Sequence, residues 1–204
     1  MGTIDVNGVA CRTPAGVELL RDVSFGVRAG EHVSLVGANG AGKTTLFRVI
    51  AGDQVPEAGS VHVTGGLRVM RQLVGWRQEG RTVRDMLLDL SPRPLQQAGH
   101  ALIGAEAAAH DEPGERTGMA LARAHTAWGD AGGWDAEVLW DTCSTIAVRQ
   151  PLSVVGERPL ATLSGGEQKR LALEVLLRSD AEVLLLDEPD NYLDVPGKEW
   201  LEEA

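Results

Sequence analysis

A group of residues in the first quarter of the chain has the types and the spacing that phosphate chemistry requires. Gly37, Gly42, Lys43 and Thr44 fill the pattern G-x-x-x-x-G-K-[ST]. Glycines let the backbone wrap closely around phosphate oxygens, the lysine neutralises the β- and γ-phosphates, and the threonine hydroxyl is a ligand for Mg²⁺. An ordinary glycine-rich turn would explain the glycines, but not the lysine and threonine directly after them.

Two neighbouring acids, Asp187 and Glu188, follow the apolar run VLLL. In a site that hydrolyses a nucleotide, the first acid can hold Mg²⁺ and the second can orient and polarise the attacking water. Taken alone, the pair is explained equally well as the solvated end of a strand. The phosphate-binding pattern in the same chain favours the catalytic interpretation.

The stretch LSGGEQ offers a further phosphate site. Ser164 and Glu167 have the spacing of a capping box at the start of a helix. A well-capped helix does not explain Gly165 and Gly166, since each glycine costs a helix about 1 kcal/mol relative to alanine. Close approach of a phosphate to the helix N-terminus, held by N–H groups and the Ser164 hydroxyl, would explain both glycines.

Regular elements must position these groups. The apolar run HVSLV, residues 32–36, predicts a strand that leads into the glycine-rich loop and then a helix. Residues 60–73 alternate in the manner of one or two strands around a Gly65–Gly66 turn, and Thr82 with Asp85 predicts a capped helix. Residues 181–188 predict a strand, and the continuous apolar run within them is typical of a sheet covered on both faces.

The region from about residue 91 to 133 has a different character, with many alanines on either side of the polar stretch HDEPGERTG. We interpret it as two helices joined by a loop. A plain helical subdomain is the favoured reading, and a projecting arm that touches a partner is the alternative. Trp128, Trp134 and Trp140 could stack on bases, but tryptophans in a helical region are more often core residues.

Composition limits the class of protein. The chain has 204 residues, 43% of them hydrophobic, and a formal charge of −10, which argues against a surface that coats nucleic acid. Cys11 and Cys143 are far apart and have no ligand-spaced neighbours, so neither a disulfide framework nor a zinc site is expected. No apolar run is long enough to span a bilayer, and we expect a cytoplasmic protein without a transmembrane segment of its own.

Taken together, the motifs resemble the nucleotide-binding domain of the ATP-binding cassette (ABC) superfamily. GANGAGKT matches Walker A, Gln72 the Q-loop glutamine, LSGGEQ the signature and VLLLDE Walker B. The stretch DEPDNYLD looks like the DEPTNHLD of the F subfamily (ABC-F), with Asp190 in place of Thr and Tyr192 in place of His. The chain most resembles the first of the two cassettes of such a protein, truncated after the D-loop.

The resemblance implies ATP and Mg²⁺ as ligands and assigns roles by position. Glu188 and Gln72 would be catalytic, and Thr44, Gln72 and Asp187 would hold the metal. Leu193 and Asp194 would form the D-loop. The residues expected to bind ATP are Gly37, Asn39, Gly40, Ala41, Gly42, Lys43, Thr44 and Thr45. The signature residues expected to serve the nucleotide of a facing cassette are Ser164, Gly165, Gly166 and Glu167.

Two departures from the family pattern stand out. Cys11 occupies the place of the aromatic residue that stacks on adenine, and all five histidines precede Walker B, whereas the family's switch histidine follows the D-loop. We therefore expect weak or no ATP hydrolysis by the isolated chain.

The predicted fold is an α/β P-loop NTPase of the ABC type, with a mostly parallel core sheet, an N-terminal antiparallel β piece and a helical insertion. Residues 1–75 would carry Walker A and the Q-loop, residues 76–162 the arm-like insertion, and residues 163–204 the signature helix, Walker B and D-loop. The leading hypothesis is an ATPase cassette that acts on the ribosome in translation or antibiotic protection. The alternatives are the ATPase subunit of a membrane transporter and a non-hydrolysing, ATP-dependent dimerisation module; each needs a second cassette as partner.

Overall fold

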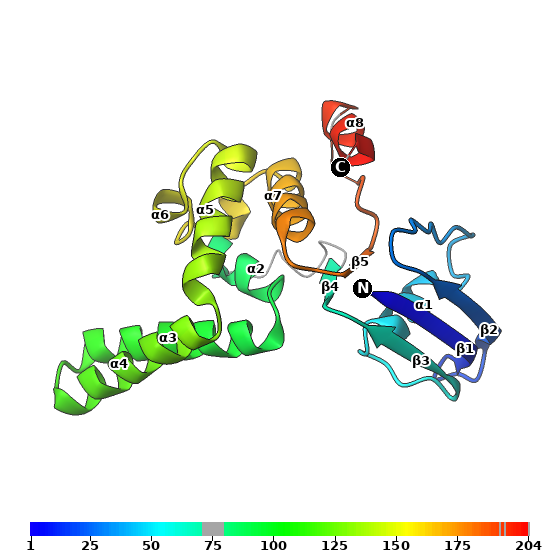
Figure 1. Cartoon of the computed structure of the whole chain (residues 1–204), viewed down its shortest axis with the longest axis horizontal. Coiled ribbons are helices and arrows are strands. Elements are labelled where there is room, and N and C mark those ends of the chain that lie inside the picture. The colour runs from blue at the N-terminus through cyan, green and yellow to red at the C-terminus, as the bar shows by residue number, and fades with distance from the viewer. Residues whose placement is uncertain (71–79, 192, 194, 204) are drawn as a thin grey trace. The chain divides into compact units, whose positions relative to one another are not determined.

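The structure, a computed structural model, describes residues 1–70, 80–191, 193 and 195–203. The chain forms two compact units (Figure 1). The strand unit comprises Met1–Arg71 and Asp180–Glu188, and the helical unit comprises Gln72–Ser179 and Pro189–Ala204. Walker A and Walker B thus belong to one unit although more than a hundred residues separate them in sequence.

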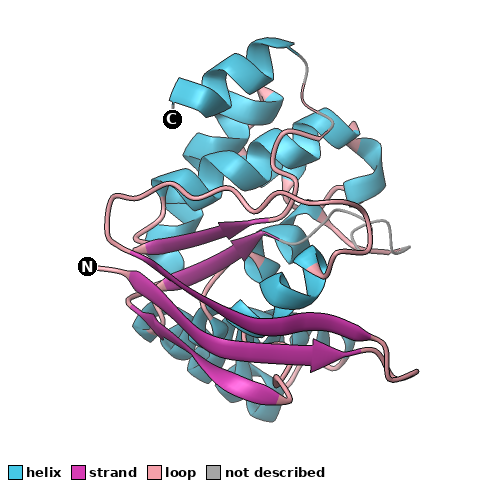
Figure 2. Cartoon of the chain, turned by 90° about the vertical axis from the view of Figure 1, so that its right-hand side faces the viewer, coloured by secondary structure: helices cyan, strands magenta, loops and turns pink. Residues whose placement is uncertain are grey.

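An antiparallel sheet with the order β2-β1-β3 forms the larger part of the strand unit (Figure 2). Its strands are β1 (Thr3–Arg12), β2 (Glu18–Val27) and β3 (Ala58–Thr64). Alternate residues of β1 are buried, as the two-residue period of a strand requires when one face meets a core. Helix α1 (Lys43–Ile50) contributes Leu46, Val49 and Ile50 to that core.

A second, parallel pair of strands joins distant parts of the strand unit. Strands β4 (Leu67–Met70) and β5 (Val183–Leu186) pair in register from Leu67–Val183 to Met70–Leu186. The strands predicted within residues 60–73 and 181–188 are confirmed where the structure describes them. Gly65, at φ +84°, separates β3 from β4, and these two strands belong to different sheets rather than to one hairpin.

The strand predicted at residues 32–36 is wrong. The described residues provide no strand paired with this segment, and Val33, Leu35 and Val36 are 61%, 51% and 86% exposed. An apolar run becomes a strand only when a second strand supplies partners for its N–H and C=O groups, and composition alone does not supply that partner.

Helices make up the second unit. They are α2 (Val83–Asp89), α3 (Arg93–Asp111), α4 (Glu115–Asp130), α5 (Gly133–Val148), α6 (Leu152–Val155), the 3₁₀ turn η2 (Leu160–Thr162), α7 (Gly165–Arg178) and α8 (Val195–Glu203). The two helices predicted between residues 91 and 133 are confirmed as α3 and α4. The Thr82 capping box is also confirmed: Asp85 N–H donates to Thr82 Oγ1 at 3.1 Å, and Thr82 N–H donates to Asp85 Oδ2 at 2.8 Å.

The core of the helical unit is built around two tryptophans. Trp128 and Trp140 are each 1% exposed, and their ring centroids lie 6.0 Å apart at a tilt of 49°. The expectation of core tryptophans is right for these two and wrong for Trp134, which is 50% exposed. None of the helices in the described ranges is long and apolar enough to cross a membrane. The fold class is α/β, with an antiparallel β piece, a parallel pair and a helical segment, as predicted.

Candidate functional site

The glycine-rich loop ends at a helix whose N-terminus is open. Helix α1 begins at Lys43, and its N-cap residue, Gly42, makes no side-chain capping hydrogen bond. The first turn of α1 contains no acidic residue. The first N–H groups of a helix have no partner inside the helix and carry a partial positive charge, so this end of α1 is suited to an anion.

The Lys43 ammonium group lies inside the loop. Lys43 Nζ donates to the Gly37 carbonyl at 2.6 Å and to the Ala38 carbonyl at 3.0 Å. Residues 37–41 are exposed, so this side of the loop is open to a ligand. The Lys43 ammonium and the free N–H groups at the start of α1 together supply the donors that the phosphates of a nucleoside triphosphate require.

Gly42 is essential to the shape of the loop. Its φ is +90°, and a Cβ placed there would lie 2.9 Å from the Leu19 carbonyl oxygen and 2.9 Å from Leu20 Cδ2. Strand β2 therefore packs directly against the N-cap residue of α1, and a larger side chain there would displace one or the other.

Asp187 and Glu188 follow the last residue of β5 in the same unit. Asp187 N–H donates to the Met70 carbonyl at 3.0 Å, which extends the β4–β5 ladder up to the acids. Asp187 is half-buried and Glu188 is exposed. Glu188 has φ +49°, a left-handed conformation that costs a residue with a side chain about 1–2 kcal/mol. Such backbone outliers cluster at functional sites.

Two of the predicted site residues, Gln72 and Asp194, lie outside the described residues. Leu193, the other predicted D-loop residue, is half-buried, and its N–H donates to the Asp190 carbonyl at 3.3 Å. Asp190 is also 3.5 Å from Lys198 Nζ on α8.

The signature residues form the start of α7 in the helical unit. Glu167 N–H donates to Ser164 Oγ at 3.2 Å, and Ser164 N–H donates to Glu167 Oε2 at 2.8 Å, so the predicted capping box is present. Gly165 and Gly166 lie in the first turn of the helix.

Cys11 is unsuited to contact a nucleobase. It is 1% exposed and belongs to the core cluster between the antiparallel sheet and α1. Its position on β1 therefore presents no side chain to solvent.

Sequence reasoning missed a buried charge on α7. The Glu174 side chain is 2% exposed and accepts a hydrogen bond from Arg178 Nε at 2.8 Å, while Arg170 Nε lies 3.9 Å away. Arg170 also lies over the ring of Trp200 on α8, 5.1 Å from its centroid. The spacing of four residues on either side of Glu174 is the signal that could have revealed this cluster.

Several longer proteins are similar to the chain in sequence. It is 45% identical, over its whole length, to an antibiotic resistance protein of Mycobacteroides abscessus. It is 38% identical over 98% of its length to the tylosin resistance ATP-binding protein TlrC of Streptomyces fradiae. It is 32% identical over 91% of its length to the energy-dependent translational throttle protein EttA of Mycobacterium tuberculosis. The matches cover 37%, 37% and 32% of these longer proteins.

A solved structure supports the fold. An ABC transporter of the metal-chelate type, in an inward-facing conformation, superposes with a TM-score of 0.60 at 17% identity, covering 100% of this chain and 67% of the other. The pattern of the family described as ABC transporter matches residues 20–191, which include the glycine-rich loop, the LSGGEQ stretch and both acids. ABC transporter F family member 5 of Arabidopsis thaliana is 29% identical over 92% of the chain. The chain is therefore an ATP-binding cassette that belongs to the ABC transporter family.

Proposed function

We propose that the chain binds ATP together with Mg²⁺ at the loop before α1 and contributes to ATP hydrolysis as one cassette of a pair. The observation that carries the proposal is the Lys43 ammonium, held by the Gly37 and Ala38 carbonyls at the uncapped N-terminus of α1. Phosphate oxygens are charged and are stronger acceptors than these carbonyls, so a nucleotide would replace them as partners of Lys43.

The other residues have complementary roles. Thr44, Asp187 and Gln72 would hold Mg²⁺, which would neutralise phosphate charge. Glu188, exposed at the end of β5, would orient a water molecule and accept its proton. The signature residues Ser164, Gly165, Gly166 and Glu167 would serve the nucleotide of the partner cassette.

Calorimetric titration with Mg-ATP tests the binding site. Lys43→Ala should weaken binding by about 10- to 100-fold, because it removes a charged hydrogen-bond donor to phosphate. Arg48→Ala is the matched control, since Arg48 is an exposed cation on the same helix. Unchanged affinity in the Lys43 variant would refute the site.

Phosphate release tests the catalytic role. Glu188→Gln should abolish any turnover while ATP binding persists, and Glu57→Gln, at an exposed acid of the same unit, should leave turnover unchanged. Turnover that survives Glu188→Gln would contradict the role given to Glu188. If the unmutated chain binds ATP but shows no turnover, even at protein concentrations at which two copies associate, the result would favour the non-hydrolysing dimerisation module.

We propose further that the ATP-dependent activity of the paired cassettes is directed at the ribosome, in translation or antibiotic protection. The support is the similarity to proteins named for antibiotic resistance and for translational throttling. Glu188→Gln should retain ATP, and this variant should therefore sediment with ribosomes in the presence of ATP and not in its absence. A variant that binds ATP and does not sediment with ribosomes would count against this role and favour a transporter subunit.

A further inference from the structure

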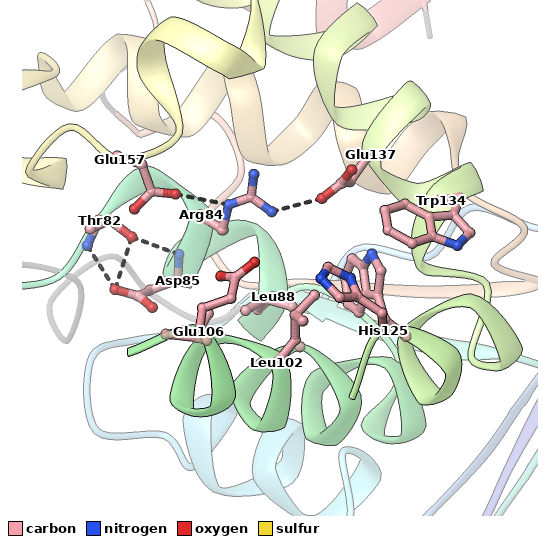
Figure 3. A pocket seen from close by; sticks show the side chains of 13 residues that line it. Thr82, Arg84, Asp85, Leu88, Leu102, Glu106, His125, Trp134, Glu137 and Glu157 are labelled. Carbon is pink, nitrogen blue, oxygen red and sulfur yellow. Dashed lines mark hydrogen bonds and ion pairs between the residues drawn. The ribbon is translucent and has the colours of Figure 1, made fainter. Parts of the chain in front are cut away.

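The helical unit contains a cavity formed by none of the residues assigned to ATP. It has a volume of about 410 Å³ and is lined mainly by residues of α2, α3, α4 and α5, with Glu157 from the segment after α6 (Figure 3). This volume lies within the range of about 300–1,000 Å³ that is typical of sites for small molecules. The elements that form it are described from Thr82 to Glu157 without a gap.

The charges around the cavity are unbalanced. Arg84 donates to Glu137 at 2.8 Å and to Glu157 at 3.0 Å. Burial alone would lower the pKa of Arg84, but the hydrogen bond and charge of Glu137, followed by those of Glu157, raise it, so the guanidinium stays charged. Its single charge faces the carboxylates of both these acids and of Asp85 and Glu106. The cavity therefore has a negative potential.

Glu106 is the acid that the protein leaves available. Asp85 accepts from the backbone N–H of Thr82 in the capping box, and Glu137 and Glu157 share Arg84. Within residues 80–191, Glu106 takes part in no hydrogen bond or ion pair. In Figure 3 its carboxylate rises from α3 into the space below Arg84. A cation in the cavity would supply its missing counter-charge.

Two aromatic side chains, Trp134 and His125, also line the cavity. The rings of Trp134 and His125 stack with centroids 6.0 Å apart and planes 14° from parallel. Trp134 remains 50% exposed. A partly exposed indole that is fixed in place by stacking offers its face to a planar group or to a cation.

Trp128 contributes a buried ring to the cavity lining. It is 1% exposed, and the Cζ3 edge of its ring lies against Gly99, which also lines the cavity. This ring therefore adds apolar surface to the lining, as is usual in pockets for small molecules.

We propose that this cavity is a binding site for a small organic cation, an amine or amidine with a planar or apolar body. Glu106 supplies the opposite charge, Trp134 supplies the aromatic face, and Leu88 and Leu102 line the apolar part. The site is independent of the nucleotide site, since no residue assigned to ATP lines it.

Benzamidine, with the neutral isostere benzamide as control, tests the proposal on the full chain. The five tryptophan indole N–H signals of a ¹H–¹⁵N spectrum report the location of binding once single tryptophan variants have assigned them. Benzamidine should shift the signals of Trp134 and Trp128 and leave that of Trp200 on α8 in place. We expect a dissociation constant of about 1 mM or lower, and binding of benzamide at least about tenfold weaker.

A matched pair of variants tests the charge. Glu106→Gln should weaken benzamidine binding by about threefold or more, since it removes a nearby opposite charge. Glu115→Gln, the same change at an exposed acid of α4 that does not line the cavity, should leave it unchanged. Both acids are exposed, so neither change should disturb the fold. Equal binding of benzamide and benzamidine, equal effects of the two variants, or no shift of the Trp134 signal would overturn the proposal.

Discussion

Replacing Gly42 with alanine tests whether the shape of the loop before α1 admits the nucleotide. Alanine at φ +90° would cost about 1–2 kcal/mol through backbone strain. Its Cβ would also lie 2.9 Å from the Leu19 carbonyl oxygen, and relieving such overpacking typically costs about 1–3 kcal/mol more. We therefore expect the loop and α1 to be destabilised by about 2–5 kcal/mol in total.

Gly40→Ala separates the two costs. Gly40 has φ +82°, but a Cβ there would meet nothing within 4 Å. This variant should therefore show the strain alone, about 1–2 kcal/mol. The difference between the two variants isolates the contact between α1 and β2.

Two measurements on the same proteins check the reasoning. Hydrogen exchange of the α1 amides reports the local stability of α1. This local measurement is needed because the chain has two units, and a single unfolding midpoint would combine the stabilities of both. Calorimetry should show Mg-ATP affinity lower in Gly42→Ala than in Gly40→Ala by about tenfold or more. If both variants lose the same α1 stability and the same ATP affinity, the β2 contact does not shape the loop and the reasoning fails.

Further predictions concern the helical unit. Gly104→Ala on α3 should raise the free energy of unfolding by about 1 kcal/mol, because the new Cβ would enter open space and alanine favours a helix. Gly99→Ala on the same helix should lower the free energy of unfolding, because the new Cβ would lie 2.3 Å from Cδ2 of the buried Leu88. Urea unfolding followed by tryptophan fluorescence measures both, and equal effects would contradict the packing. Arg149→Gly should stabilise the C-terminal end of α5 by about 0.5–1 kcal/mol, since Arg149 has φ +58°, and Arg149→Ala should show no such gain. Burial raises the pKa of Cys143 to about 11, so the folded chain keeps this proton after the unfolded chain has lost it. Stability should therefore fall as the pH rises from about 9 toward 11, and pH-dependent urea titrations of Cys143→Ala should lack that part of the fall.

The sequence predicted helices in the region described as an arm-like insertion, but it did not predict a small-molecule site there. The acid and the aromatic residues of the proposed site come from different helices, so α3 and α5 must be packed before the ligand can bind. Binding of benzamidine would then also stabilise the helical unit, because a ligand that binds only the folded state shifts the unfolding equilibrium.

Local patterns in the sequence determined much of the fold and located the candidate site. The capping boxes at Thr82 and Ser164 and the start of α1 at Lys43 all depend on residues within about four positions of one another. Hydrogen bonds of that range form wherever the same short pattern recurs, so sequence alone predicts them.

Only the tertiary structure decided features that need a distant partner. Residues 32–36 and β5 are both rich in apolar residues, but β5 pairs with β4 and no described strand pairs with residues 32–36. Burial of Cys11 and exposure of Trp134 likewise depend on the elements packed around them. The cavity beside Glu106 exists because helices far apart in the sequence converge around it. Side-chain type and spacing along the chain do not encode such contacts directly, since they depend on which surfaces meet after folding.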